Sequence, residues 1–195
     1  MANKDAAFGL RPVRMMGGAP YSGGQSRYRI ASGLSGKIFQ GDLVKQVTGG
    51  GIERAAASST VPVVGVFNGC QYTDPTSGEQ VFSNYYPGSI AASDIIAFII
   101  DDPMTVFAVQ ADAAFPVADL FGNFDIVDQA TTGDTASGRS NVELDVTTGA
   151  TATTLPLKAL DISQDPDNDD VASANTNVLV VIQNHIAGVK SAGLA

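Results

Sequence analysis

The sequence is poor in the residue types from which active sites and metal sites are built. Among 195 residues there is one cysteine (Cys70), one histidine (His185) and no tryptophan. A single cysteine excludes an intrachain disulfide and any metal site with several cysteines, and a free cysteine most often lies in the core. No Gly-x-Ser-x-Gly segment is present, so His185 has no recognisable nucleophile as a partner. We therefore predict a protein that is not an enzyme and has no catalytic residues and no cofactor.

Long apolar runs are also missing. No stretch of 18 apolar residues occurs, and about that length is needed for a helix to span a membrane. The N-terminus lacks the charged segment followed by an apolar one that marks a secretory signal. We expect a protein made and kept in the cytoplasm of the producing cell, unless a particle carries it out, and we expect no membrane partner.

Acidic residues are scarce at the beginning of the chain, and basic residues are scarce in the remainder. Residues 1–54 hold eight Lys and Arg against three acids, a net charge of +5. Residues 55–195 hold three basic residues against seventeen acids, a net charge of −14. One end is thus suited to a negatively charged partner. Because the larger acidic part would repel a polyanion, we expect no nucleic-acid partner.

Turn-forming residues are abundant. The chain has 21 Gly and 9 Pro between short β-branched runs, and its hydrophobic content of 44% is sufficient for a core. This pattern predicts an all-β protein with a compact β-barrel or β-sandwich body of short antiparallel strands. Only residues 116–121 have features of a helical turn, so we expect less than about 15% helix. The body covers residues 27–195, and a division into two subdomains would fall near residues 110–125.

The most apolar stretch of the chain is IIAFIIDDPMTVFAV, residues 95–109. Residues 95–100 have no polar position on either face, so a strand formed by them must be covered on both sides. Residues 104–109 are almost as apolar, and the Asp-Asp-Pro sequence at 101–103 is typical of a turn. We therefore predict that the two runs form a hairpin at the centre of a β core.

Other strands are predicted by short alternating runs. The segment TGGG at 48–51 predicts a hairpin between strands 42–47 and 52–55. Glycines within residues 63–72 predict a strand with a bulge. Further strands are expected at 27–31, 80–86, 142–146, 155–162 and 177–183.

Residues 1–26 predict an extended N-terminal arm. They contain two prolines, five glycines and single apolar residues that follow neither a strand nor a helix period. Such a segment cannot recover its ordering entropy by packing on itself, so we expect it to be mobile until it binds a partner, with a frayed terminus as the alternative. Apolar side chains would enter pockets and the arginines would pair with carboxylates. The predicted partner-binding residues of this arm are Phe8, Leu10, Arg11, Val13, Arg14 and Tyr21.

The acidic segment at 165–170 has some features of a cation site. Asp165, Asp167 and Asp169 have the spacing of the first three ligands of a calcium loop. However, Asp170 occupies the position of the required glycine, and Thr176 that of the bidentate glutamate. We therefore predict a solvated turn and no metal site, with an adventitious cation as the alternative.

Several phrases of the sequence are similar to those of one family. They are the opening MANKDAAFGLRPVR, GAPYSGGQSRYRIASG, GDLVK, DLFGNFDIV and the closing NVLVVIQNHIAG. With these phrases the chain resembles a capsid decoration, or cement, protein of tailed double-stranded DNA bacteriophages of the marine and cyanobacterial type. The resemblance spans most of the chain. It implies a virion structural protein, made in the host cytoplasm, that binds the major capsid protein on the outer capsid surface and stabilises the head.

The resemblance also implies self-association and leaves alternatives. A homotrimer is expected, or alternatively a homodimer, and apolar residues on both faces of several short strands favour an oligomer as well. The family has no catalytic residues to carry over. The alternative is another virion component, a tail-tube or receptor-binding β protein, with a cellular carbohydrate-binding domain more distant. A receptor binder usually exposes aromatic residues at a tip, and this chain has no tryptophan.

Overall fold

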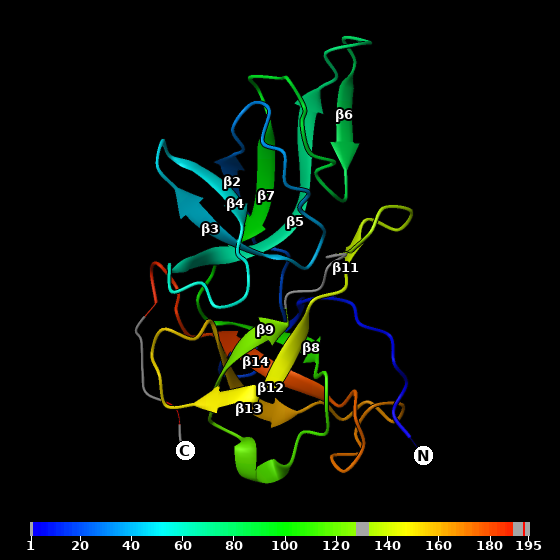
Figure 1. The fold of residues 1–195 in the computed structure, drawn as a ribbon, viewed down its shortest axis with the longest axis vertical. Helices are drawn as coiled ribbons and strands as arrows, with labels where there is room; N and C mark the ends of the chain where they lie inside the picture. Colours follow the sequence, from blue (N-terminus) through cyan, green and yellow to red (C-terminus); the bar gives the residue numbers. More distant parts are fainter. Residues whose placement is uncertain (1, 128–132, 189–192, 194–195) are drawn as a thin grey trace.

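The protein is built almost entirely of β-strands. The computed structural model describes residues 2–127, 133–188 and 193 (Figure 1). In these residues there is no α-helix, and the only helical element is a single 3-10 turn, η1 (Val117–Asp119). This turn lies within the segment predicted to be helical. The all-β prediction, with sheets packed into a sandwich-like body, is confirmed.

The strands form two antiparallel sheets and a short ribbon. We call the sheets lower and upper after their places in Figure 1. The lower sheet has the order β1 (Arg11–Met15), β8 (Thr105–Gln110), β14 (Asn177–Ile182), β13 (Leu157–Ile162), β9 (Asn123–Val127) and β12 (Glu143–Ala150). The upper sheet has the order β2 (Ser26–Arg29), β7 (Ile96–Ile100), β5 (Val63–Thr73), β3 (Leu43–Val47) and β4 (Gly51–Arg54), with β6 (Gln80–Ser83) beside β5. The ribbon consists of β10 (Gly133–Asp134) and β11 (Arg139–Ser140).

Local sequence explains the irregular points of the upper sheet. The turn between β3 and β4 places Gly49 and Gly50 at φ +102° and +79°, values that glycine adopts without strain. In β5 the register with β7 shifts between Phe67 and Gly69, and Gly69 has φ +137°. The predicted hairpin and the predicted bulge are therefore both confirmed.

Two apolar cores stabilise the molecule, and the upper sheet separates them. The first core lies between the sheets, where lower-sheet residues such as Phe107 meet upper-sheet residues such as Ile100. The second core covers the other face of the upper sheet and includes Ile99. Because successive strand residues point to opposite faces, Ile99 and Ile100 enter different cores. Residues 95–100 are thus covered on both sides, as their composition predicted.

The single cysteine belongs to the second core. Cys70, on β5, is only 1% exposed. Burial raises the pKa of its thiol to about 12, so the thiol stays protonated at neutral pH. The prediction of a core cysteine is confirmed.

The predicted hairpin of residues 95–109 is wrong. Strand β7 pairs with β2 and β5 in the upper sheet, whereas β8 pairs with β1 and β14 in the lower sheet. Residues 101–104 connect the two sheets instead of closing a hairpin. Asp101 accepts hydrogen bonds from Ser26 Oγ (3.0 Å) and Tyr28 Oη (2.8 Å), which hold it beside β2. Apolar content shows that both strands are buried, but it does not determine the partner of either.

The chain therefore changes sheets at residues 101–104. The interval 110–125 holds the end of β8, the turn η1 and the start of β9, and both strands belong to the lower sheet. Core residues of the two sheets pack in one cluster, which joins the sheets into one body.

The separate N-terminal arm is not confirmed. Residues 11–15 form β1, which pairs with β8 at the edge of the lower sheet. Leu10 is 2% exposed and belongs to the core between the sheets. Farther toward the N-terminus, Asn3 Nδ2 donates to the carbonyl of Asp170 (2.9 Å), and the Ala6 N–H donates to Gln110 Oε1 (2.9 Å). The first segment lacks a period of its own because it takes its structure from the body of the same chain.

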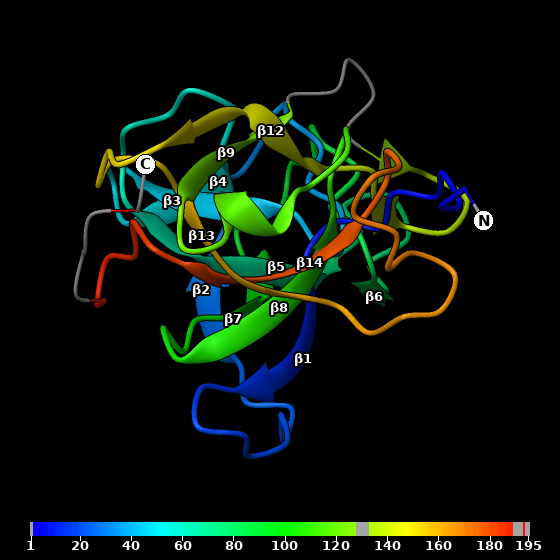
Figure 2. The same ribbon diagram turned by 90° about the horizontal axis from the view of Figure 1, so that it is seen from below.

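Only residues 16–25 project from the body. They connect β1 to β2 and extend away from the sheets (Figure 2). The Met15 N–H donates to the Ala19 carbonyl (2.8 Å), and Tyr21 Oη donates to the Gly24 carbonyl (2.8 Å). We call this segment the projecting loop. It is the part of the predicted arm that extends farthest from the sheets.

Candidate functional site

Two edge strands bring basic residues to one side of the molecule. Strand β1 is an edge of the lower sheet and β2 is an edge of the upper sheet, and both lie on the same side in Figure 2. In β2, alternation exposes Arg27 and Arg29. In β1, Arg11 is exposed and Arg14 is half-buried beside an irregularity in the strand register. We call the surface of Arg11, Arg14, Arg27 and Arg29 the basic side.

These arginines have no ion-pair partner in the part of the chain that the structure describes. The ion pair found there joins Lys45 Nζ to Glu53 Oε1 (3.3 Å) and involves none of these arginines. Arg11 and Arg27 instead lie over aromatic rings, with guanidinium carbons 4.9 Å from the Phe8 centroid and 5.8 Å from the Phe98 centroid. Such contacts orient a guanidinium group without neutralising it. The positive charge of the basic side is therefore available to another molecule.

One carboxylate lies beside the basic side, and it is engaged by β2. The oxygens of Asp101 accept the hydrogen bonds of Ser26 and Tyr28 described above. Burial, the hydrogen bond to Asp101 and the charge of Asp101 raise the pKa of Tyr28 to about 12. The phenol therefore remains a donor at neutral pH and fixes β2 to the start of the connection at residues 101–104.

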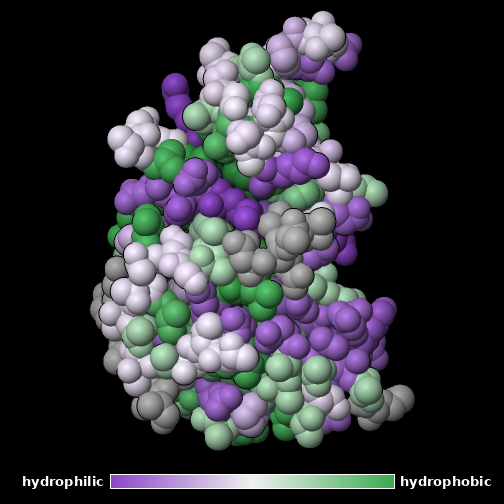
Figure 3. Space-filling model, viewed as in Figure 1, coloured by the Kyte–Doolittle hydropathy of each residue, from purple (hydrophilic) through white to green (hydrophobic). Residues whose placement is uncertain are grey.

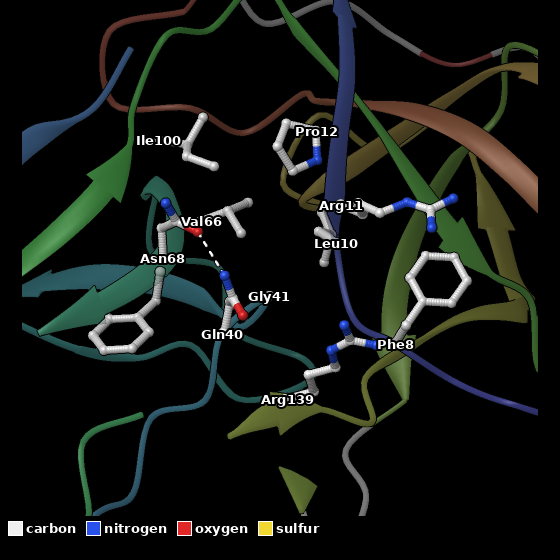
Figure 4. A pocket seen from close by; sticks show the side chains of 11 residues that line it. Phe8, Leu10, Arg11, Pro12, Gln40, Gly41, Val66, Asn68, Ile100 and Arg139 are labelled. Atoms are coloured by element: carbon white, nitrogen blue, oxygen red, sulfur yellow. Dashed lines mark hydrogen bonds between the residues drawn. The ribbon is translucent and has the colours of Figure 1, made fainter. Parts of the chain in front are cut away.

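A cavity of about 190 Å³ lies where the start of β1 meets β5 and β11 (Figure 4). We call it the arginine cavity, because two arginines from distant parts of the chain line it. Its lining residues are Phe8, Leu10, Arg11, Pro12, Gln40, Gly41, Val66, Phe67, Asn68, Ile100 and Arg139.

Three chain segments cross at this cavity and are tied by backbone hydrogen bonds. The Leu10 N–H donates to the Gly41 carbonyl (2.9 Å), and the Ser140 N–H donates to the Gln40 carbonyl (2.9 Å). Gly9 allows the close approach, because a Cβ there would lie 2.7 Å from Ser140 Cβ, and its φ of +69° also favours glycine. The wall of the cavity is therefore a fixed part of the fold.

Amide side chains form the polar wall of the arginine cavity. Gln40 Nε2 donates to Asn68 Oδ1 (2.9 Å), and Asn68 Nδ2 donates to Gln25 Oε1 (2.9 Å). Because Gln25 directly precedes β2, this chain of amides links the cavity to the second edge strand. No acidic residue among those described lines the cavity. Its lining combines two cations, two amides and an apolar floor.

The structure separates the predicted site residues. Phe8 and Arg11 line the arginine cavity, Arg14 lies on the basic side and Val13 is 44% exposed on β1. Tyr21 belongs to the projecting loop and packs against the first core. Leu10 reaches the cavity floor from the core and is too buried to contact a partner as a surface residue.

Sequence reasoning missed the three polar side chains that line the cavity from outside the N-terminal segment. Gln40, Asn68 and Arg139 are distant from the N-terminal segment in the sequence, and no local pattern connects them. One signal was present for Arg139, which is one of only three basic residues after position 54. A basic residue in an otherwise acidic region is a candidate for a specific role.

The single histidine is buried just beyond β14. His185 is 2% exposed, and its Nδ1 accepts a hydrogen bond from the Ala187 N–H (3.0 Å). Its Nε2 is buried without a hydrogen-bond partner among the described residues. Desolvation by burial lowers the pKa of the imidazole, although the nearby Asp101 and Asp102 act in the opposite direction.

We expect this histidine to make stability depend on pH. An unfolded histidine has a pKa of about 6.5, so below that pH the unfolded chain gains a proton that folded His185 resists. The free energy of unfolding should be constant near pH 7.5 and fall below pH 6.5, by at most about 1.4 kcal/mol per pH unit. Urea unfolding at pH 7.5, 6.5 and 5.5 measures this. The same slope in His185→Gln would contradict the assignment.

The acidic turn at 165–170 directs its carboxylates toward its own backbone and neighbours. Asp165 accepts hydrogen bonds from the Asp167 N–H (3.2 Å) and from Asn177 Nδ2 (3.1 Å). Asp170 accepts from the Ala172 N–H (3.0 Å) and from Ser173 Oγ (2.9 Å). Within the described residues, no group of three His, Cys, Asp or Glu side chains is placed to hold a metal ion.

The wider features of the chain add little to this site. In the described part of the structure, no helix has the length and apolar character to cross a membrane. The candidate site consists of the basic side and the arginine cavity.

No protein-family model, no curated protein and no solved structure matches this chain.

Proposed function

We propose that this chain is a non-enzymatic virion structural protein that binds the outer surface of the major capsid protein shell and stabilises the head. The observation that carries the proposal is the basic side, where four arginines on two neighbouring sheet edges have no ion-pair partner within the described chain. The resemblance to phage decoration proteins supplies the identity of the partner. An acidic surface on the capsid would provide the missing carboxylates.

The chemistry of arginine supports attachment to an acidic protein surface. A guanidinium group can form two parallel hydrogen bonds to one carboxylate, so it fixes orientation as well as charge. The acidic remainder of the chain would be repelled from the same surface, which favours one orientation of the body. The protein would therefore attach by β1 and β2 with its opposite side facing solvent.

The surface away from β1 and β2 is suited to solvent. Strands β1 and β12 are opposite edges of the lower sheet, and β12 is near the viewer in Figure 1. On this face hydrophobic residues are scattered among hydrophilic ones in small patches (Figure 3). Small apolar patches do not drive association, so this side remains soluble on a particle.

Apolar side chains at one end of β1 support a further protein contact. Val13, Met16 and Met104 are 44%, 42% and 49% exposed, and the Met16 N–H donates to the Met104 carbonyl (2.7 Å). These side chains would pack either on the capsid or on another copy of this chain. A homotrimer, or alternatively a homodimer, is part of the proposal, and light scattering of the isolated protein tests it.

One observation favours the alternative of a receptor-binding virion component. Phe82 on β6 is 67% exposed, and it borders a groove of about 280 Å³ together with Tyr85 and uncharged polar residues such as Asn84. An exposed aromatic ring beside hydroxyl and amide groups is a common element of ligand sites. Labelling of the protein on intact virions would place it on the head or on the tail.

Attachment to undecorated heads of the phage that encodes the chain tests the proposal. Arg14→Glu combined with Arg29→Glu should weaken attachment by about a hundredfold at low salt, because like charges would then face each other. The matched control is Lys37→Glu on an exposed residue outside the basic side. Cosedimentation of protein with heads measures the affinity, and added salt should weaken the wild-type complex. Absence of wild-type attachment, or unchanged affinity of the folded double variant, would refute the proposal.

A further inference from the structure

We infer that the arginine cavity binds a single carboxylate side chain, an Asp or Glu that the capsid partner presents to it. This inference deepens the proposed function and rests on it for the source of the side chain. It adds the residues that receive the carboxylate, and these include Arg139, which lies outside the predicted arm.

The charge of the cavity indicates an anion. Arg11 and Arg139 both line it, and no described acidic residue does so. Neither guanidinium has a carboxylate within ion-pair distance in the described chain. Both arginines contribute to the lining, and a guanidinium suits a carboxylate because it offers several N–H donors in a planar arrangement.

The lining favours a carboxylate on an aliphatic stem over a free phosphate. Phe8 and Pro12 are partly exposed and contribute apolar side chains to the wall, and these can contact the methylene groups of a Glu side chain. Phosphate sites use many donors and commonly include backbone N–H groups. Here the uncharged donors are the side-chain amides of Gln40 and Asn68, and each already shares a hydrogen bond.

The size of the cavity suits a single side chain. Its volume of about 190 Å³ accommodates the few non-hydrogen atoms of an Asp or Glu side chain. The cavity therefore matches one protruding side chain of a partner.

The site is organised before any ligand binds. The Phe8 ring supports the Arg11 guanidinium at 4.9 Å, and the amides of Gln40, Asn68 and Gln25 hold one another in a chain. The crossing of the three segments is secured by the backbone bonds of Leu10 and Ser140. Preformed geometry lowers the entropic cost of binding, which suits a pocket that must capture one side chain.

A titration of the isolated full chain tests the cavity without any capsid. The probe is N-acetyl-glutamate N-methylamide, and its matched neutral control is N-acetyl-glutamine N-methylamide. NMR should show saturable shifts of amides near residues 8–12, 40–41, 66–68 and 139 with the Glu probe only. Arg11→Gln or Arg139→Gln should each weaken binding about tenfold, and the double variant should abolish it. Lys37→Gln should leave binding unchanged.

Three results of this titration would overturn the inference. They are shifts that do not localise to the cavity, equal shifts with the Gln probe, and undiminished binding in the folded double variant. Tighter binding of inorganic phosphate than of the Glu probe, at the same residues, would overturn the assignment to a carboxylate. Retained but weaker binding in Arg139→Lys would support it, because lysine keeps the charge and loses the paired geometry.

Attachment to undecorated heads then identifies the source of the carboxylate. The Arg11→Gln, Arg139→Gln double variant should attach about a hundredfold more weakly than wild type if the capsid supplies the side chain. If this variant loses Glu-probe binding and still attaches normally, the capsid does not supply it and the inference is overturned, while the proposed function stands. If wild type fails to attach to heads, the proposed function fails, whatever the titration shows.

Discussion

Replacing Phe107 with Ala should lower the free energy of unfolding by about 3 to 5 kcal/mol. Phe107 is fully buried on β8, between β1 and β14, and its ring lies in the core that joins the two sheets. Removal of the ring leaves a cavity bordered by both sheets. The neighbouring strands cannot collapse into it without losing their pairing, so most of the cost remains.

The matched control for this substitution is Phe82→Ala. Phe82 is 67% exposed on β6, so its removal should change stability by no more than about 0.5 kcal/mol. Urea unfolding followed by far-UV circular dichroism measures both variants at pH 7.5. Equal losses in the two variants would show that Phe107 does not lie in a packed core between the sheets.

Replacing Gly65 with Ala should lower stability by about 3 kcal/mol. Gly65 lies on β5, where an added Cβ would collide with the carbonyl oxygen of Ile100 and lie 2.8 Å from Ile99 Cγ2. Both obstacles belong to β7, and the oxygen is a backbone atom. Relief requires β7 to move away from β5 at the centre of the upper sheet.

Gly36→Ala is the matched control for this change. No atom lies within 4 Å of a Cβ built at Gly36, and its φ is not positive. Alanine should therefore be neutral there or stabilise the protein by up to about 1 kcal/mol, through the unfolded state. In a chain of this length, a loss of 3 kcal/mol lowers the melting temperature by roughly 6 to 12 °C. Equal melting temperatures of Gly65→Ala and wild type would contradict the close approach of β5 and β7.

The candidate site was only partly predictable from sequence. Phe8 and Arg11 were selected because single apolar and basic residues in a glycine-rich segment have no local partner. The same reasoning assigned Leu10 to a partner surface, whereas this side chain enters the chain's own core. Gln40 and Arg139 reach the cavity through hydrogen bonds between segments distant in the sequence. No local pattern encodes such a contact.

The all-β class, several strands and the burial of the most apolar ones follow from local sequence. Alternation, glycine turns and β-branched runs act over a few residues, so these features could be read from local sequence. Residues 95–100 were correctly expected to be covered on both faces.

The pairing of the strands and the position of the first residues depend on tertiary contacts. Residues 95–100 and 104–109 have the composition of two strands of one hairpin, yet they lie in different sheets. The N-terminal segment has no period, yet it supplies an edge strand and part of the arginine cavity. Strand partners and cavities depend on the free energy of contacts between distant segments, and buried strands of similar composition leave several pairings open to local reasoning.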